Sequence, residues 1–206
     1  MNLSFVALGK NEYYHSGNIG IHSKMLNSVI DHIVIGAKEL VSETKKLEAS
    51  LNAKFLPGGK HTLMATHNRL LKLQESLYLE VIAIDPKACP SEAIGGRKRW
   101  FSLDAASTKQ RLARSAQPLT WVLAVSDIEY AASKCGYNPG EIIEVSRDNL
   151  KWRLTVPADG SLNEGGTLPS LIEWPNGKNP TYLMPESGVR LEHIVISHPE
   201  PKRILE

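Results

Sequence analysis

Apolar residues recur along the chain in short runs whose spacing predicts the same order of elements twice. In the first half, the pattern predicts a helix at residues 38–51 and strands at 29–36, 53–56, 68–73 and 77–84. In the second half, it predicts a helix that begins after Asp127 and strands at 119–125, 141–146, 150–156 and 168–174. The chain is therefore predicted to hold two strand, helix, strand, strand, strand modules.

The remaining segments complete a predicted division of the chain. Residues 1–24 form an N-terminal extension with a short strand at 4–8, and residues 87–118 form a linker with a short strand at 100–103 and a short helix at 109–116. The modules themselves are expected at 25–86 and 119–175. Residues 176–206 supply one further strand, at 190–197, and a tail.

The run at 77–84 carries one charged residue, Glu80, among apolar neighbours on both faces of the predicted strand. An unpaired ionised carboxylate is very costly in such surroundings. Glu80 is therefore expected to meet a proton, a cation or strong hydrogen-bond donors.

Composition and charge narrow the function classes. With 206 residues and a net charge of +2, the chain gives no electrostatic argument for binding nucleic acid or a membrane surface. Cys89 and Cys135 lie far apart and form no redox or metal-binding spacing. No apolar run approaches the length of a membrane span, and the first residues lack the pattern of a signal peptide, so a cytoplasmic location is expected.

Several short motifs carry a resemblance to a known family. They are Asp31-His32-Ile33-Val34, Gly58-Gly59-Lys60-His61, Thr66-His67-Asn68-Arg69-Leu70, Tyr78-Leu79-Glu80, Arg99-Trp100-Phe101, Ser146-Arg147 and Trp152-Arg153. With the repeated element order, they resemble the glyoxalase-like domain family of the vicinal oxygen chelate superfamily. The resemblance implies an α+β fold: two βαβββ modules that form a cup-shaped pair of mixed-sheet half-barrels, with an extra C-terminal strand.

The resemblance also implies a metal site. Superfamily ligands come from the first and fourth strands of each module, which here points to His32, Glu80 and Glu173, with the Trp121 region at the fourth corner. Tryptophan cannot bind a metal, but one imidazole and two carboxylates suit Zn, Mn, Fe or Ni. The alternatives are a metal-free hydrogen bond between His32 and Glu80, and an exposed strand carboxylate at Glu173.

Further residues are candidates for contacting a substrate. His61 follows two glycines that permit a tight turn, Asn68 stands where a loop meets a strand, and Arg147 could clamp an anionic group. Trp100 and Trp152 suit the wall of an apolar cavity. Ordinary structural roles, in a turn, a salt bridge or the core, are the alternatives for all five.

Two function hypotheses follow, and both need a small-molecule ligand. The first is a metal-dependent lyase, isomerase or dioxygenase in which Glu80 or Glu173 moves a proton on a small oxygen-rich substrate. The second is a binding protein that sequesters a compound without catalysis, as the bleomycin-resistance branch does. A third, an interaction role without a ligand, would be favoured by an occluded cavity, and a homodimer stays an open alternative.

Overall fold

The computed structural model describes residues 2–8, 28–88, 98–147, 149–175 and 177–200. Most of the predicted N-terminal extension, residues 9–24, and the part of the linker that contains Cys89 lie outside the described residues. None of the helices among the described residues has the length and apolar content needed to cross a membrane.

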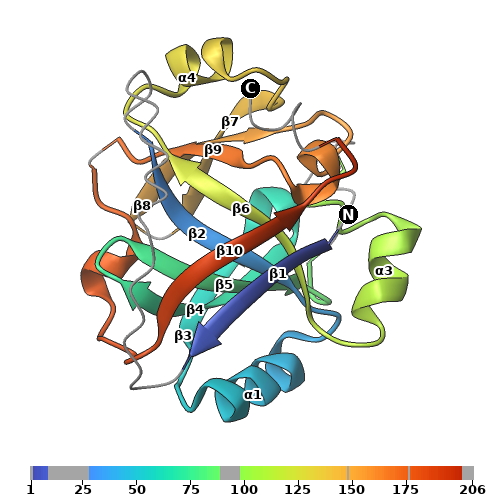
Figure 1. Ribbon diagram of the computed structural model, residues 1–206, viewed down its shortest axis with the longest axis vertical. Helices are drawn as coiled ribbons and strands as arrows, with labels where there is room; N and C mark the ends of the chain where they lie inside the picture. Colours follow the sequence, from blue (N-terminus) through green and yellow to red (C-terminus); the bar gives the residue numbers. More distant parts are fainter. Residues whose placement is uncertain (1, 9–27, 89–97, 148, 176, 201–206) are drawn as a thin grey trace.

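Two successive modules with the predicted element order build one mixed sheet (Figure 1). The first module consists of β2 (Val29–Gly36), α1 (Leu40–Leu51), β3 (Leu56–His61), β4 (Thr66–Gln74) and β5 (Leu77–Ile84). The second consists of β6 (Gln117–Ala124), α4 (Ile128–Lys134), β7 (Glu141–Arg147), β8 (Leu150–Val156) and β9 (Ser170–Glu173). The strand order, β3-β4-β5-β2-β6-β9-β8-β7, is symmetric about the antiparallel pair β2 and β6. The predicted fold class is confirmed.

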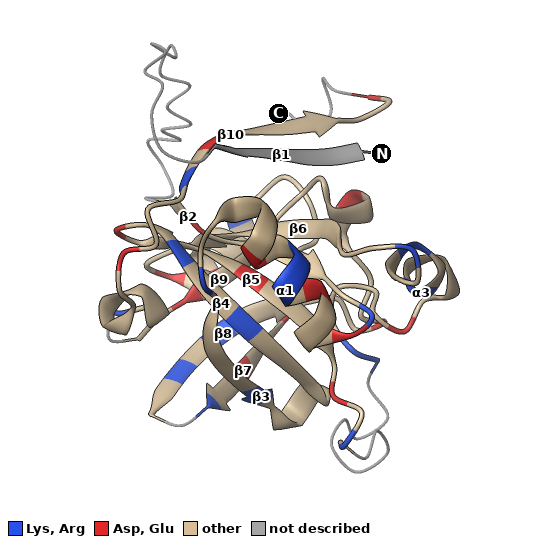
Figure 2. Ribbon diagram, turned by 90° about the horizontal axis from the view of Figure 1, so that it is seen from below, with Lys and Arg blue, Asp and Glu red and all other residues tan. Residues whose placement is uncertain are grey.

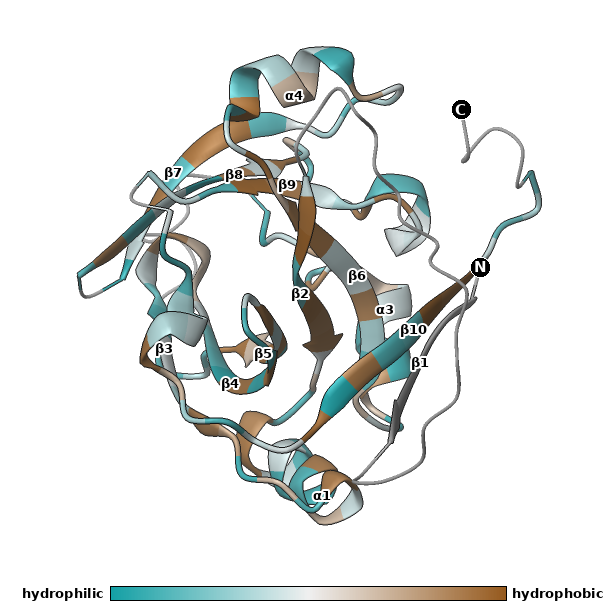
Figure 3. Ribbon diagram, turned by 60° about the vertical axis from the view of Figure 1, so that its left-hand side comes forward, coloured by the Kyte–Doolittle hydropathy of each residue, from teal (hydrophilic) through white to brown (hydrophobic). Residues whose placement is uncertain are grey.

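The sheet curls so that its two edge strands, β3 and β7, approach one another, and Figure 3 looks into this curl. Successive residues of each strand face opposite sides. Val34, Ile82 and Ile172 therefore join the core inside the curl, whereas Ile33 and Val81 join the core between the sheet and α1. Both faces are buried, which is why the central strands read as almost continuous apolar runs.

The terminal strands form a separate two-stranded ribbon. β1 (Asn2–Leu8) pairs antiparallel with β10 (Arg190–Ser197). Figure 2 shows β10 lying outside the main sheet. Leu191 and Ile194 of β10 pack against the outer core. The predicted C-terminal strand is confirmed.

Some local predictions are corrected. The strand predicted at residues 53–56 instead begins at Leu56 and runs through Pro57-Gly58-Gly59 to His61. An edge strand tolerates proline and glycine because part of its backbone needs no partner. The strand predicted at 100–103 is a turn, with positive φ at Phe101 and Ser102, and the linker helix begins earlier, as α3 (Ala106–Leu112). Asp127 does cap α4, and its carboxylate accepts a hydrogen bond from the Tyr130 N–H.

Candidate functional site

A small cavity of about 30 Å³ opens on the inner face of the curled sheet. The first module lines it with His32, His61, Asn68, Tyr78 and Glu80, and the second with Arg147, Trp152, Leu154, Ile172 and Trp174. Trp100 and Phe101 of the linker and Pro180 complete the wall. The space suffices for roughly two water molecules.

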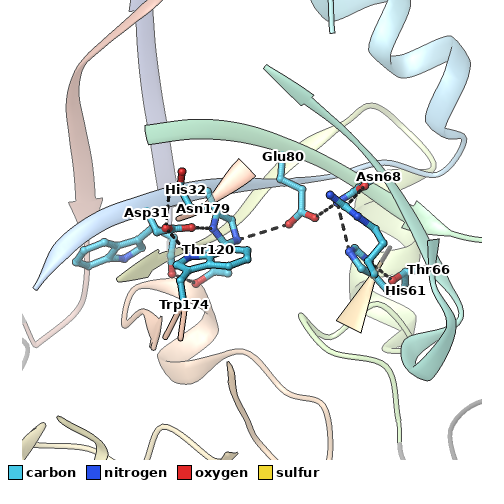
Figure 4. A network of polar contacts seen from close by, with 11 residues as sticks. Asp31, His32, His61, Thr66, Asn68, Glu80, Thr120, Trp174 and Asn179 are labelled. Atoms are coloured by element: carbon cyan, nitrogen blue, oxygen red, sulfur yellow. Dashed lines mark hydrogen bonds and ion pairs between the residues drawn. The ribbon is translucent and has the colours of Figure 1, made fainter. Parts of the chain in front are cut away.

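The His32 imidazole is held by a buried carboxylate from the preceding residue. Asp31 Oδ1 accepts a hydrogen bond from His32 Nδ1 at 2.7 Å. Asp31 Oδ2 accepts from Trp174 Nε1 at 2.9 Å and from Asn179 Nδ2 at 3.0 Å (Figure 4). Because Nδ1 donates to Asp31, His32 turns its other nitrogen, Nε2, toward Glu80.

The Glu80 carboxylate lies opposite His32 Nε2, and both side chains line the cavity. Its Oε2 lies 3.7 Å from His32 Nε2, and its Oε1 accepts a hydrogen bond from Asn68 Nδ2 at 2.5 Å. Only 5% of Glu80 is exposed. Alternation along β5 explains the placement, because Leu79 and Val81 point into the outer core while Tyr78 and Glu80 point inward. The structure thus brings His32 and Glu80 face to face, but at 3.7 Å the two side chains do not form the direct hydrogen bond considered as the metal-free alternative.

Asn68 continues the network toward the second module. Its Oδ1 accepts hydrogen bonds from the Gly59 N–H at 2.8 Å and from Arg147 Nη1 at 3.2 Å. Its Nδ2 also lies 3.4 Å from His61 Nε2. One amide side chain therefore joins Glu80, His61 and Arg147. Figure 4 shows Glu80, Asn68 and His61 at its right.

His61 and Tyr78 are buried rings that keep their ordinary uncharged forms. Burial, followed by the nearby Arg147 charge, lowers the pKa of His61 to about 3, so the imidazole is neutral near pH 7. His61 Nδ1 lies 3.0 Å from Thr66 Oγ1. Burial also raises the pKa of Tyr78 well above its ordinary value, and the Tyr78 ring stacks on His32 with centroids 4.6 Å apart.

Glu173, the other predicted ligand, lies on the opposite face of the sheet. Its neighbours Ile172 and Trp174 line the cavity, so alternation turns Glu173 outward. There its Oε2 accepts from the Ile128 N–H at the start of α4 at 2.8 Å. Arg153 Nη2 donates to both carboxylate oxygens, at 2.8 and 2.7 Å. Glu173 is therefore not brought together with His32 and Glu80.

The chain matches the model of one protein family over residues 30–206, a family described as the glyoxalase-like domain. The chain belongs to the glyoxalase-like domain family. This agrees with the resemblance carried by the sequence motifs. No curated protein sequence matches the chain.

Solved structures with similar folds are only distantly related to this glyoxalase-like chain. A hypothetical protein from Staphylococcus aureus is 21% identical with a TM-score of 0.49, over 71% of this chain and 58% of that one. A methylmalonyl-CoA epimerase from Mycobacterium tuberculosis is 15% identical with a TM-score of 0.44, over 70% of this chain and 86% of that one. A Streptomyces coelicolor methylmalonyl-CoA epimerase variant, in complex with 2-nitronate-propionyl-CoA, is 14% identical with a TM-score of 0.47, over 74% of this chain and 98% of that one.

The second module of this glyoxalase-like protein lacks counterparts of the two candidate ligands of the first module, His32 and Glu80. Ile33 pairs with Trp121 at the centre of the β2–β6 ladder, so strand pairing relates His32 to Thr120 and Glu80 to Ser170. Both related residues are buried hydroxyls. Trp121 itself donates its indole N–H to the Thr167 carbonyl at 3.1 Å. A four-ligand site divided equally between the modules does not form.

The fit to a metal ion is therefore partial. Among the described residues, no group of three or more His, Cys, Asp or Glu side chains could hold a metal ion. His32 and Glu80 fit as two ligands, and Asp31 behind His32 is the carboxylate that commonly orients a metal-binding imidazole. Any further position on such an ion would need water or substrate.

Three residues of the network were not expected from the sequence. Asp31 could have been found, because it stands in an apolar strand in the same way as Glu80. Trp174 and Asn179 reach Asp31 from more than 140 positions away and have no local signal.

Proposed function

We propose that this protein is an isomerase- or lyase-type enzyme that moves a proton on a small oxygen-rich substrate, with Glu80 as the group that accepts the proton. The observation that carries the proposal is the Glu80 carboxylate, almost fully buried at the wall of the cavity and facing His32 Nε2 at 3.7 Å. A positioned carboxylate of this kind suits general base catalysis next to a carbonyl group.

The two oxygens of Glu80 have different surroundings, which suggests how the proton would move. Oε1 accepts a hydrogen bond from Asn68, whereas Oε2 faces the more distant His32 Nε2 and accepts no hydrogen bond from a described residue. In the proposed step, a C–H bond next to a carbonyl breaks and the proton goes to Oε2. The electron pair stays with the substrate and spreads onto the carbonyl oxygen. Asp31 and Tyr78 would keep the His32 ring in place.

A divalent cation would be held by the His32 imidazole, and Zn, Mn, Fe or Ni there would polarise substrate oxygens as a Lewis acid. Glu80 Oε2 can serve either as a second ligand of such an ion or as the base that accepts the proton, and the proposal assigns it to the base. The residues His61, Asn68, Trp100 and Trp152 would shape the space around the substrate.

Exchange of carbon-bound hydrogen for deuterium tests the proposal directly. Small hydroxy aldehydes and hydroxy ketones are incubated with the protein in D₂O and followed by NMR, with and without added Zn²⁺, Mn²⁺ or Ni²⁺. Glu80→Gln should slow exchange by about a hundredfold or more. Glu173→Gln, on the opposite face, is the matched control and should exchange like wild type. Equal exchange by wild type and Glu80→Gln would refute the proposal.

A sequestering role is the second candidate, and the aromatic wall favours it. Trp100, Trp152 and Trp174 all line the cavity, and such walls bind apolar or cationic compounds through their ring faces. Under this alternative, ligands quench tryptophan fluorescence and are recovered unchanged, and Glu80→Gln binds them as wild type does. Measuring exchange and quenching on the same ligands separates the two roles.

A further inference from the structure

Two buried N–H groups beside the cavity have no hydrogen-bond partner among the residues that the structure describes. They are Nε1 of Trp100, a residue that is 2% exposed, and Nε of Arg147. Trp100 and Arg147 both line the cavity. A buried donor without an acceptor costs free energy, so a pair of them in one cavity indicates that a ligand supplies the acceptor.

Arg147, which is half-buried, differs in its electrostatic surroundings from the buried Arg99. Arg99 Nη1 lies 2.7 Å from Asp104 Oδ1. In the part of the chain that the structure describes, no carboxylate lies within ion-pair distance of Arg147, and its guanidinium donates a hydrogen bond to the neutral Asn68 amide. The neighbouring His61 is uncharged near pH 7, because burial lowers its pKa to about 3. Arg147 therefore brings to the cavity a cation that makes no direct ion pair with a described residue.

The sequence makes room for this guanidinium with two glycines. A Cβ atom on Gly59 would lie 2.2 Å from Arg147 Cδ and 2.8 Å from Arg147 Nε. A Cβ atom on Gly58 would lie 2.1 Å from Asn68 Oδ1. Only glycine lets β3 approach these two side chains so closely. The Gly58-Gly59 pair thus positions Arg147, which comes from the other module, against the cavity.

The cavity lining consequently contains both hydrogen-bond donors and a carboxylate. Arg147 and Trp100 supply N–H groups, Glu80 supplies the carboxylate, and the Asn68 amide lies between Glu80 and Arg147. An anionic group is attracted to Arg147 and repelled from Glu80. The space of about 30 Å³, roughly that of two water molecules, favours a small ligand.

We infer that the ligand of this cavity is a small carboxylic acid whose carboxylate is bound by the Arg147 guanidinium and the Trp100 indole N–H. The planar guanidinium presents paired N–H donors that suit a carboxylate. Bound in this way, the acid directs its remaining atoms toward Glu80. The inference that the acid is a substrate rests on the proposed function. The inference that the acid binds does not, because binding needs no chemistry at Glu80.

Binding of lactate and pyruvate, compared with the neutral lactamide, tests the inference. Tryptophan fluorescence reports the affinity, and inorganic phosphate is the competing anion. Wild type should bind lactate or pyruvate at least about tenfold more tightly than lactamide or phosphate. Arg147→Gln should weaken acid binding about tenfold or more, and Trp100→Phe should weaken it less. Arg153→Gln, on the outer face of the neighbouring strand, is the matched control and should bind like wild type.

The outcomes separate this inference from the proposed function. Lactamide or phosphate binding as tightly as the acids would overturn the inference, and so would acid binding that Arg147→Gln leaves unchanged. If Arg147→Gln does not fold, the affinities of Arg147→Lys and Trp100→Phe for lactate and pyruvate are compared with that of wild type instead, and unchanged affinities would overturn the inference. Acid binding without any Glu80-dependent exchange would sink the proposed function alone. Exchange on neutral hydroxy ketones, with no acid bound, would sink the acid inference alone.

Discussion

The two modules share an element order and a strand register, but they contribute different chemistry to the cavity. The first supplies His32, His61 and Glu80, with Asp31 behind them. The second supplies Arg147 and otherwise mostly apolar and aromatic side chains. At the positions related by strand pairing, the second module has the hydroxyls of Thr120 and Ser170. The second module therefore repeats the strand arrangement of the first module but not its candidate site residues.

The second module nevertheless completes the polar network of the first. Trp174 and Asn179 donate to Asp31, and Arg147 donates to Asn68. Each of these bonds runs from the second half of the chain to a buried acceptor in the first half. The site is thus asymmetric and needs both halves of the chain. The first half supplies the buried acceptors, and the second half supplies several of the donors.

The largest expected effect comes from removing the acceptor that links the halves. Asp31→Ala leaves the N–H groups of His32, Trp174 and Asn179 without their partner, so we expect a loss of about 3–5 kcal/mol in the free energy of unfolding. Glu173→Ala, which removes a more exposed carboxylate of the second module, should cost only about 1 kcal/mol. Urea denaturation measures both. Equal losses would show that the hydrogen bonds between the modules contribute no more to the free energy of unfolding than a partly exposed ion pair does.

The glycines give a second comparison. In Gly58→Ala, the new Cβ atom would lie 2.3 Å from the Asn68 backbone oxygen, which cannot swing aside as a flexible side chain can. We expect a loss of about 1–3 kcal/mol and a displaced Asn68. Gly136→Ala, just after α4 in the second module, meets no atom within 4 Å and should leave thermal stability nearly unchanged. A similar melting temperature for both variants would contradict the close packing of β3 on β4.

The third prediction concerns pH, through His61. Its folded-state pKa of about 3 lies below the ordinary value of 6.5, so between these pH values the unfolded chain binds a proton that the folded chain does not. Stability should therefore fall as the pH falls from 6.5 toward 3, by up to about 1.4 kcal/mol per pH unit from this group. His61→Gln removes that contribution and should flatten the curve, whereas His193→Gln, exposed on β10, should not. Parallel curves for wild type and His61→Gln would refute the assignment.

How far the sequence predicts the site is clearest from its two glutamates. Glu80 and Glu173 both stand in apolar strands near the end of a module, and the sequence treats them alike. The structure turns Glu80 inward and Glu173 outward, because a shift of one residue along a strand reverses its face. Strand periodicity predicts the two modules and singles out Glu80, and the family resemblance adds His32. The direction in which a residue of a short strand such as β9 faces depends on pairing with β6 and β8.

Distance in sequence sets the other limit. Arg147 reaches Asn68 and Asn179 reaches Asp31 only because the sheet curls and closes. The Gly58-Gly59 pair was visible as a turn signal, yet its role is to let a side chain of the other module approach. Local sequence patterns cannot predict such long-range contacts, because each partner on its own looks like an ordinary polar residue.

The smallest expected effect is on the free energy of unfolding when Arg147 of β7 or Arg153 of β8 is replaced. Arg153 pairs with Glu129 and Glu173 at the surface, so Arg153→Gln should cost no more than about 1 kcal/mol, and less in high salt because exposed pairs are screened. Arg147→Gln breaks no ion pair among the described residues and removes a buried unpartnered N–H, so the free energy of unfolding should change by less than about 0.5 kcal/mol. Denaturation in low and high salt measures both. A large, salt-sensitive loss for Arg147→Gln would mean that this arginine serves stability rather than ligand binding.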